Sequence, residues 1–196
     1  MTSQEPGMVE HQAESLVGRL LVATPALQDP NFERTVVLLV SHETAGALGV
    51  VLNRATEVPV AEVLGEWCEL TQEPAVLFEG GPVQPEAAIA LGWMRNDAGQ
   101  PSCFKPFLGR LGTLDLSADP EPLNGSLEGM RVFAGYASWD SDQLSDEINE
   151  GAWMVFDSLP GDPFDSRPED LWSMVWRRQG GLTGAVALYP ADPSHN

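Results

Sequence analysis

The sequence predicts a mixed α+β fold in which a sheet built around one antiparallel hairpin packs against helices. Residues 36–40 and 48–52 are short continuous runs rich in β-branched side chains, a pattern typical of strands buried on both faces. The polar connection at residues 41–46 is too short for a parallel crossover, which needs roughly a dozen residues or more. We therefore expect an antiparallel hairpin, around which the rest of the chain is organised.

A first strand and a loop are predicted before this hairpin. The strand is expected at residues 16–24. Pro25 and Pro30 then interrupt any regular element, because proline fixes φ, lacks an N–H group and restricts the residue before it. The loop at residues 28–33 is expected to bring Arg34 to the start of the hairpin.

A short helix is predicted after the hairpin, at residues 59–67, with proline at its tolerated first position. Four apolar side chains have the spacing of a single helix face: Val60, Val63, Leu64 and Trp67. We expect this face to pack on the sheet.

The other expected strands are apolar runs bounded by turn residues. They lie at residues 76–79, 87–94, 111–116, 131–137, 153–156 and 183–189. Gly80 and Gly81 form a turn after the first of these, and residues 131–137 are predicted to be a central strand. The segments 117–129 and 159–167 are rich in proline, glycine and acidic residues, so the first is expected to be an exposed excursion and the second a loop.

Two further helices are predicted in the last third of the chain. Asp140 is expected to cap one that ends at Gly151, with Gln143 completing the capping box. The clearest helix pattern begins at Pro168 and stops at Gly180, with an acidic first turn and two arginines in the last. Its inward face is expected to hold Leu171, Trp172, Val175 and Trp176.

Length and composition indicate one soluble globular domain. The 196 residues match a single domain of roughly 200 residues, which we expect to span residues 16–196 after a flexible polar tail at 1–15. No apolar run approaches the ~18 residues of a membrane span, and no secretory signal is visible. Cys68 and Cys103 lie far apart in no metal or redox spacing, so we expect reduced thiols and a cytoplasmic location.

The net charge limits the partners that the chain can bind. Twenty-nine acidic residues against ten basic ones give a net charge of −19. Nucleic-acid affinity comes largely from basic side chains that displace counterions, so direct nucleic-acid binding is disfavoured. The acidity is explained by solubility alone, or it targets a basic protein surface or a cation.

The common catalytic motifs are missing from the sequence. It contains no phosphate-binding loop, dinucleotide fingerprint, zinc-protease helix or serine-hydrolase elbow. Asp140 and Asp142 begin like a calcium loop, but Leu144 replaces the third ligand, so we expect neither a metal nor a cofactor. Among the three histidines, His11, His42 and His195, only His42 is placed for acid–base chemistry, and a solvated or hydrogen-bonded role is the alternative.

One polar cluster is expected where the hairpin begins and ends. In an antiparallel pair, Arg34 at the start of the first strand should lie near Asn53 and Arg54 at the end of the second. Guanidinium groups match carboxylate or phosphate, and the Gly80-Gly81 turn would offer backbone N–H groups, so the cluster is a candidate site for an anionic ligand. The alternative is that Arg34 pairs with a neighbouring carboxylate and pins a loop.

Four aromatic residues allow a second interpretation. Tyr136, Trp139, Trp172 and Trp176 form a recognition surface if they are exposed together. Tryptophans at positions i and i+4 of an amphipathic helix more often belong to the core.

Four segments, in order, resemble the YqgE/AlgH family of bacterial proteins. They are GRLLVATPALQDPNFERTVVLLVSH (18–42), GALGVVLNR (46–54), GGPV (80–83) and RVFAGYASWDSDQL (131–144). The resemblance implies an α+β fold whose mostly antiparallel sheet bends toward a pseudo-barrel with packed helices. It supplies no agreed catalytic residues, although some members carry the label of a transcriptional regulator. Ser138, Asp142 and Ser145 depart from the family pattern, which affects any role for the loop after Tyr136.

Two functional hypotheses follow from the sequence. The first is a non-enzymatic regulatory or interaction protein that binds a protein partner and affects gene expression indirectly. The second is a binder of, or weak enzyme on, a small anionic metabolite at Arg34, Asn53 and Arg54. The sequence specifies no oligomeric state.

Overall fold

The computed structural model describes residues 15–190 and contains one ten-stranded, mostly antiparallel sheet. Its main path runs β10-β1-β2-β3-β9-β6-β8-β7, with β4 and β5 attached through β9. The strands are Arg19–Ala23 (β1), Val36–Glu43 (β2), Gly46–Val51 (β3), Ala55–Pro59 (β4), Val76–Glu79 (β5), Val83–Met94 (β6), Phe104–Leu108 (β7), Leu111–Leu114 (β8), Leu127–Asp140 (β9) and Trp153–Asp157 (β10).

The predicted hairpin is confirmed as the antiparallel pair of β2 and β3. Val36 and Leu38 point into one hydrophobic cluster, whereas Val37 and Leu39 point into another, and all four are fully buried. Because successive side chains of a strand face opposite sides, a continuous apolar run fits a sheet covered on both faces. The covering elements differ, with α3 (Leu171–Arg177) contributing to the first cluster and α2 (Gln143–Asn149) to the second.

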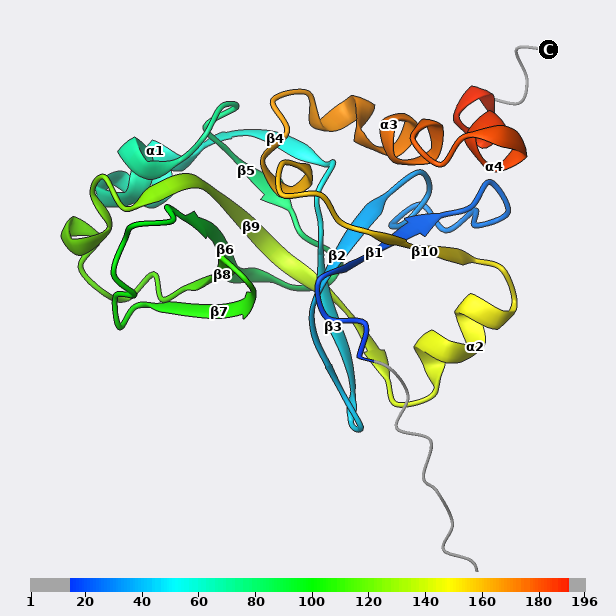
Figure 1. Cartoon of the computed structure of the whole chain (residues 1–196), viewed down its shortest axis with the longest axis horizontal. Coiled ribbons are helices and arrows are strands. Elements are labelled where there is room, and N and C mark those ends of the chain that lie inside the picture. Colours follow the sequence, from blue (N-terminus) through cyan, green and yellow to red (C-terminus); the bar gives the residue numbers. More distant parts are fainter. Residues whose placement is uncertain (1–14, 191–196) are drawn as a thin grey trace, which may run out of the picture.

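Strand β9 joins the two parts of the sheet (Figure 1). Residues 127–136 pair with β6, and residues 137–140 pair with β3. Gly135, with φ of 70°, lies where the strand passes from one neighbour to the other. The sheet curls into a half-barrel with helices packed on it, which confirms the predicted fold class.

Helix α3 also follows its predicted pattern. Pro168–Asp170 forms a 3₁₀ turn that leads into it, and its four predicted core residues are buried. The indole N–H of Trp172 donates to the carbonyl oxygen of Ala23, 2.8 Å away, and thereby ties the helix to β1. The first hydrophobic cluster is therefore closed by α3.

The prediction of a last strand at residues 183–189 is wrong. This segment forms α4 (Gly181–Ala185) and a 3₁₀ turn, Val186–Leu188. Its backbone hydrogen bonds stay local, with the N–H of Gly184 donating to the carbonyl oxygen of Gly180, and the segment packs against α3 and adds no strand to the sheet. Tertiary context overrides the strand propensity of a short apolar run.

The predicted helix at residues 59–67 is interrupted. It consists of α1 (Val60–Val63) and a separate 3₁₀ helix, Gly65–Leu70, because Leu64 leaves the helical region with φ −134° and ψ 61°. Val60 and Trp67 are buried as expected, but Val63 is 58% exposed. The single packed face of four residues is therefore wrong at Val63.

Two predictions around β9 also need correction. The segment 117–129 is not fully exposed, since Leu123 is completely buried and β9 already begins at Leu127. Asp140 belongs to the end of β9 and does not cap a helix, because α2 begins at Gln143 with Asp142 as its N-terminal flank. Half of the expected capping box survives, as the side-chain oxygen of Gln143 accepts the N–H of Asp140 at 3.2 Å.

Strands β4 and β7 were not expected from the sequence. Pro59 and Pro106 lie within them, and proline is an unfavourable strand residue except at edges and strand ends. Strand β7 is an edge of the sheet and β4 pairs only with β5, so both prolines occupy positions where a missing N–H is tolerated. The tail predicted at residues 1–15, apart from Ser15, lies outside the described residues, as do His11 and His195.

Candidate functional site

Asn53 connects the two ends of the hairpin. Its side-chain oxygen accepts the N–H of Val36 at 2.9 Å, and its side-chain nitrogen donates to the carbonyl oxygen of Arg34, also at 2.9 Å. Arg34 has φ of 53°, a left-handed conformation that is uncommon for residues other than glycine. The expected proximity of Arg34 and Asn53 is therefore present, and the Asn53 amide holds the backbone of this strained residue.

The Arg34 guanidinium fastens the C-terminal segment. Its carbon lies 3.9 Å from the ring centre of Trp172, and a terminal nitrogen donates to the carbonyl oxygen of Tyr189 at 2.9 Å. Burial lowers the pKa of Arg34, and the neighbouring Glu33 carboxylate acts in the opposite direction. A hollow of about 50 Å³ adjoins these groups and is also lined by Thr24.

Arg54 points to a different partner. One of its terminal nitrogens donates to the carbonyl oxygen of Pro30 at 2.7 Å, within the loop that precedes the hairpin. Arg54 does not line the hollow beside Arg34. The two guanidinium groups thus come from the same corner of the fold but each already donates to a backbone carbonyl.

Gly80 and Gly81 lie beside the end of β3, where the N–H of Val51 donates to the Gly80 carbonyl oxygen at 2.9 Å. The N–H of Gly80 donates to Ala134 on β9 at 2.8 Å. A Cβ atom at either glycine would overlap the β9 backbone, and Gly81 has φ of 150°. Close approach of two backbones therefore accounts for the glycine pair, and the Gly80 N–H is engaged within the sheet.

His42 lies on β2, opposite Ala47, and not in the hairpin turn where the sequence placed it. Its Nδ1 atom accepts the N–H of Leu16 at 3.0 Å, so it anchors the chain just before β1. The hairpin connection is shorter than predicted, because β2 continues to Glu43.

The aromatic candidates belong mostly to the core. Trp139, Trp172 and Trp176 are at most 5% exposed, and Tyr136 packs partly buried against the first hydrophobic cluster. The indole N–H of Trp139 donates to a carboxylate oxygen of Glu147 on α2. These residues do not form a shared exposed surface.

The three residues that depart from the family pattern lie near or just after the C-terminal end of β9. Ser138 is an exposed strand residue paired with Leu48, and Ser145 is exposed on α2. Asp142 flanks the start of α2 without a side-chain hydrogen bond to its backbone. None of the three contacts the cluster of Arg34, Asn53 and Arg54 in the described hydrogen bonds.

Arg131 is a buried polar residue that sequence reasoning assigned only to a strand. It is 2% exposed and donates to the carbonyl oxygens of Glu73, Pro163 and Asp165 at 3.0–3.1 Å. Burial lowers its pKa to about 10, and its guanidinium carbon lies 4.2 Å from the ring centre of Phe78. In the sequence, the only indication of this buried role was the presence of an arginine in an otherwise apolar strand.

Comparison with known proteins identifies the family. The AlgH-like family model, DUF179, matches residues 20–183. A UPF0301 protein of Streptomyces coelicolor is 50% identical over 193 residues, covering 97% of this chain and 99% of that protein. The chain belongs to the AlgH-like family.

Two solved structures are similar to this AlgH-like chain over most of its length. A crystal structure of a protein from Corynebacterium diphtheriae has 32% identity and a TM-score of 0.83, covering 95% of this chain and 94% of that one. The solution structure of AlgH from Pseudomonas aeruginosa has 29% identity and a TM-score of 0.66, covering 98% and 99%.

Residues 15–190 of the AlgH-like chain contain neither a cluster of metal-ligating side chains nor a helix of membrane-spanning length. Within residues 15–190, no group of three or more histidine, cysteine or acidic side chains is arranged to hold a metal ion. No helix in the same range is long and apolar enough to cross a membrane. Cys68 is half-buried and Cys103 is buried, and both are free thiols.

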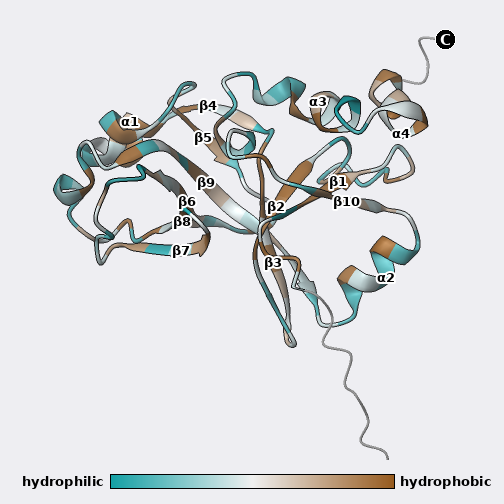
Figure 2. Ribbon diagram, viewed as in Figure 1, coloured by the Kyte–Doolittle hydropathy of each residue, from teal (hydrophilic) through white to brown (hydrophobic). Residues whose placement is uncertain are grey.

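The C-terminal segment carries the two most exposed large apolar side chains of the described residues, and a third that is half exposed. Leu182 is 93% exposed, Leu188 is 80% exposed and Tyr189 is 49% exposed. Figure 2 shows this end of the ribbon, at α4, in the brown of hydrophobic residues. We refer to these three residues as the C-terminal apolar surface. This surface lies beside Arg34, because the Arg34 guanidinium donates to the carbonyl oxygen of Tyr189.

Proposed function

We propose that this AlgH-like chain is a non-enzymatic, cytoplasmic protein-interaction module, and that any effect on gene expression is indirect. The supporting observation is the C-terminal apolar surface. Removing apolar area from water contributes about 25 cal/mol per Å², so three large side chains left exposed within one short segment favour a partner that covers them.

The polar candidates support this function more than a catalytic one. The side chains of Arg34, Asn53 and Arg54 are engaged with the backbone, where they hold the loop before β2 and the segment around Tyr189. A net charge of −19 disfavours direct binding to a phosphate backbone. A protein partner is consistent with both observations.

The test is in-cell crosslinking of a tagged chain followed by mass spectrometry. We expect a stoichiometric protein partner with the wild type and its loss with the double variant Leu182→Glu/Leu188→Glu. Val63→Glu is the matched control, because Val63 is also an exposed apolar residue but lies on α1, at the other end of the molecule (Figure 1). The proposal is wrong if the double variant recovers the same partner as the wild type, or if the wild type itself recovers no protein partner.

A second candidate function is the binding of a small anion beside Arg34. It is supported by the hollow of about 50 Å³ next to a partly desolvated guanidinium with a strained backbone. This hollow is far smaller than the ~300–1,000 Å³ of a typical ligand pocket, so the candidate ligand is a small anion such as acetate or inorganic phosphate.

Thermal denaturation with acetate and with inorganic phosphate tests the second candidate. An anion bound at Arg34 raises the midpoint in the wild type and leaves it unchanged in Arg34→Met. The control is Arg95→Met, since Arg95 is an exposed arginine outside this corner. Equal stabilisation of wild type and Arg34→Met would eliminate the site.

A further inference from the structure

A surface groove lies between the β7–β8 turn and the loop that follows β10. It consists of two adjoining hollows of about 380 and 250 Å³, which share Trp93, Arg110 and Pro160 in their linings. The groove contains none of the residues of the C-terminal apolar surface, so it is a separate feature of the molecule.

Each wall of the groove carries an exposed leucine. Leu108, next to the β7–β8 turn, is 41% exposed, and Leu159, in the loop after β10, is 53% exposed. Trp93 and Leu111 complete the apolar lining between them. A hollow between two exposed leucines is a site that an apolar side chain of a partner can fill.

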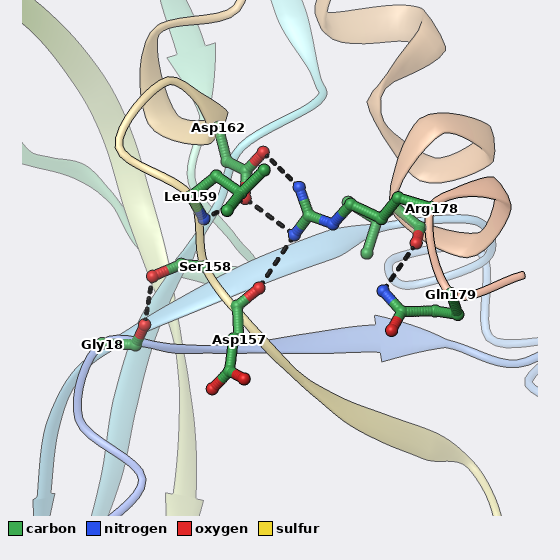
Figure 3. Close-up of polar contacts among 8 residues, drawn as sticks. Gly18, Asp157, Ser158, Leu159, Asp162, Arg178 and Gln179 are labelled. Carbon is green, nitrogen blue, oxygen red and sulfur yellow. Dashed lines mark hydrogen bonds and ion pairs between the residues drawn. The ribbon is translucent and has the colours of Figure 1, made fainter.

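The wall that carries Leu159 is rigidly held (Figure 3). Arg178, which follows the last residue of α3, donates to both carboxylate oxygens of Asp162 at 2.7 and 2.9 Å, and to the carbonyl oxygen of Asp157 at 2.8 Å. Asp162 in turn accepts the N–H of Leu159 at 2.7 Å. A partly buried ion pair therefore fixes the loop backbone that carries Leu159. A partner that binds here would lose little free energy in ordering this loop.

Both walls are anchored to Gly18, the residue just before β1. The Ser158 hydroxyl donates to the carbonyl oxygen of Gly18. Gly18 also packs so closely against Leu108 that a Cβ atom there would overlap its side chain. Both leucine-bearing walls thus rest on the residues just before β1, and the groove is preformed.

The charges around the groove compensate one another. Arg110 pairs with Glu128 at 3.0 Å and lies 4.8 Å from the ring centre of Trp93. The two acidic residues that flank the loop, Asp157 and Asp162, are each paired with an arginine. In a chain with nineteen excess negative charges, an apolar segment can enter here without stranding an unpaired carboxylate.

The net charge of the whole chain determines which charge the flanks of a partner segment should carry. Twenty-nine acidic side chains against ten basic ones attract a positively charged chain and repel a negative one. We infer that the groove docks a segment of a protein partner that presents apolar side chains to Trp93, Leu108 and Leu159 and carries lysine or arginine in its flanks.

Fluorescence anisotropy with labelled synthetic peptides tests this inference on the full chain. The probe is a peptide of leucine and lysine, compared with one that has serine in place of leucine and one that has glutamate in place of lysine. We expect the leucine–lysine peptide to bind most tightly, because only it has both the apolar anchors and the positive charge.

The decisive variant is Leu159→Glu, with Leu108→Glu as a second one from the other wall. Each should weaken binding of the leucine–lysine peptide about tenfold, although each adds a negative charge that attracts lysine. Val63→Glu adds the same charge on α1 and should bind like the wild type, as should Leu182→Glu/Leu188→Glu, which tests the other surface.

Three results would overturn the inference. In the first, the serine–lysine peptide binds as tightly as the leucine–lysine peptide, which would mean charge attraction alone. In the second, the leucine–glutamate peptide binds as tightly as the leucine–lysine peptide. In the third, both leucine variants bind the leucine–lysine peptide as tightly as the wild type does. Because the C-terminal double variant is scored separately, failure of the groove is distinguishable from failure of the proposed function.

Discussion

Arg178 and Asp162 form a two-pronged ion pair across sixteen residues of sequence, with nitrogen–oxygen distances of 2.7 and 2.9 Å. The Asp162 side chain is 7% exposed and that of Arg178 is 25% exposed. The pair therefore joins the end of α3 to the loop after β10 in a partly desolvated position, where charge-assisted hydrogen bonds are strongest.

Asp162→Asn should lower the free energy of unfolding by about 2 kcal/mol, because it leaves the Arg178 charge without its partner. Urea unfolding measures the change. Asp157→Asn is the control, since Asp157 is 83% exposed in its pair with Arg19, and we expect a change of about 0.5 kcal/mol or less. Equal effects of the two variants would contradict this assignment.

Glu147 is expected to be the main polar anchor of α2. One of its carboxylate oxygens accepts the indole N–H groups of Trp139 and Trp153 at 2.9 and 2.8 Å. Glu147→Ala leaves two buried donors without an acceptor and should destabilise the fold by about 2 kcal/mol. Chemical unfolding followed by tryptophan fluorescence measures this, with the exposed Glu150→Ala as the control that stays near wild type.

Gly81→Ala should be among the most damaging single-methyl additions. The added Cβ atom would overlap the backbone of Tyr136, and φ of 150° disfavours any L side chain. We expect a loss of at least about 3 kcal/mol or failure to fold, measured by circular dichroism during heating. Gly99→Ala meets no atom within 4 Å, so a similar loss there would show that the close approach is not the cause.

Arg131→Met should destabilise the chain by about 3 kcal/mol, because three carbonyl oxygens lose their donor. These carbonyls belong to Glu73, Pro163 and Asp165, so the segments around them should exchange amide hydrogens faster than in the wild type. Hydrogen exchange with mass spectrometry locates the change. Arg95→Met, at an exposed arginine, should leave these segments unaffected, and uniform loosening in both variants would refute the prediction.

Local patterns in the sequence were sufficient for the elements with strong periodicity. The runs of β2 and β3 alternate between two cores, and the inward face of α3 contains all four predicted residues. Local patterns were insufficient where the intrinsic preference of a segment disagrees with its packing in the folded chain. Residues 183–189 have strand-like composition but form a short helix and a 3₁₀ turn that pack against α3, and β7 contains a proline that only an edge strand tolerates.

The candidate site shows the same division. The antiparallel hairpin alone predicted that Arg34 and Asn53 would be neighbours, and they are. It gave no information on Tyr189, whose carbonyl oxygen receives the Arg34 guanidinium from 155 residues away. Arg131 was missed because its three acceptors come from two distant segments.

The sequence by itself determined the central hairpin, the C-terminal helix, the charge of −19 and the family, because each is recorded in adjacent residues or in overall composition. The tertiary structure alone decided which polar groups are occupied and which apolar ones are exposed. Arg34 and Arg131 acquire their partners only when segments far apart in sequence meet. Leu108 and Leu159 line one groove because Leu108 packs on Gly18 and Ser158, the neighbour of Leu159, donates to the Gly18 carbonyl oxygen.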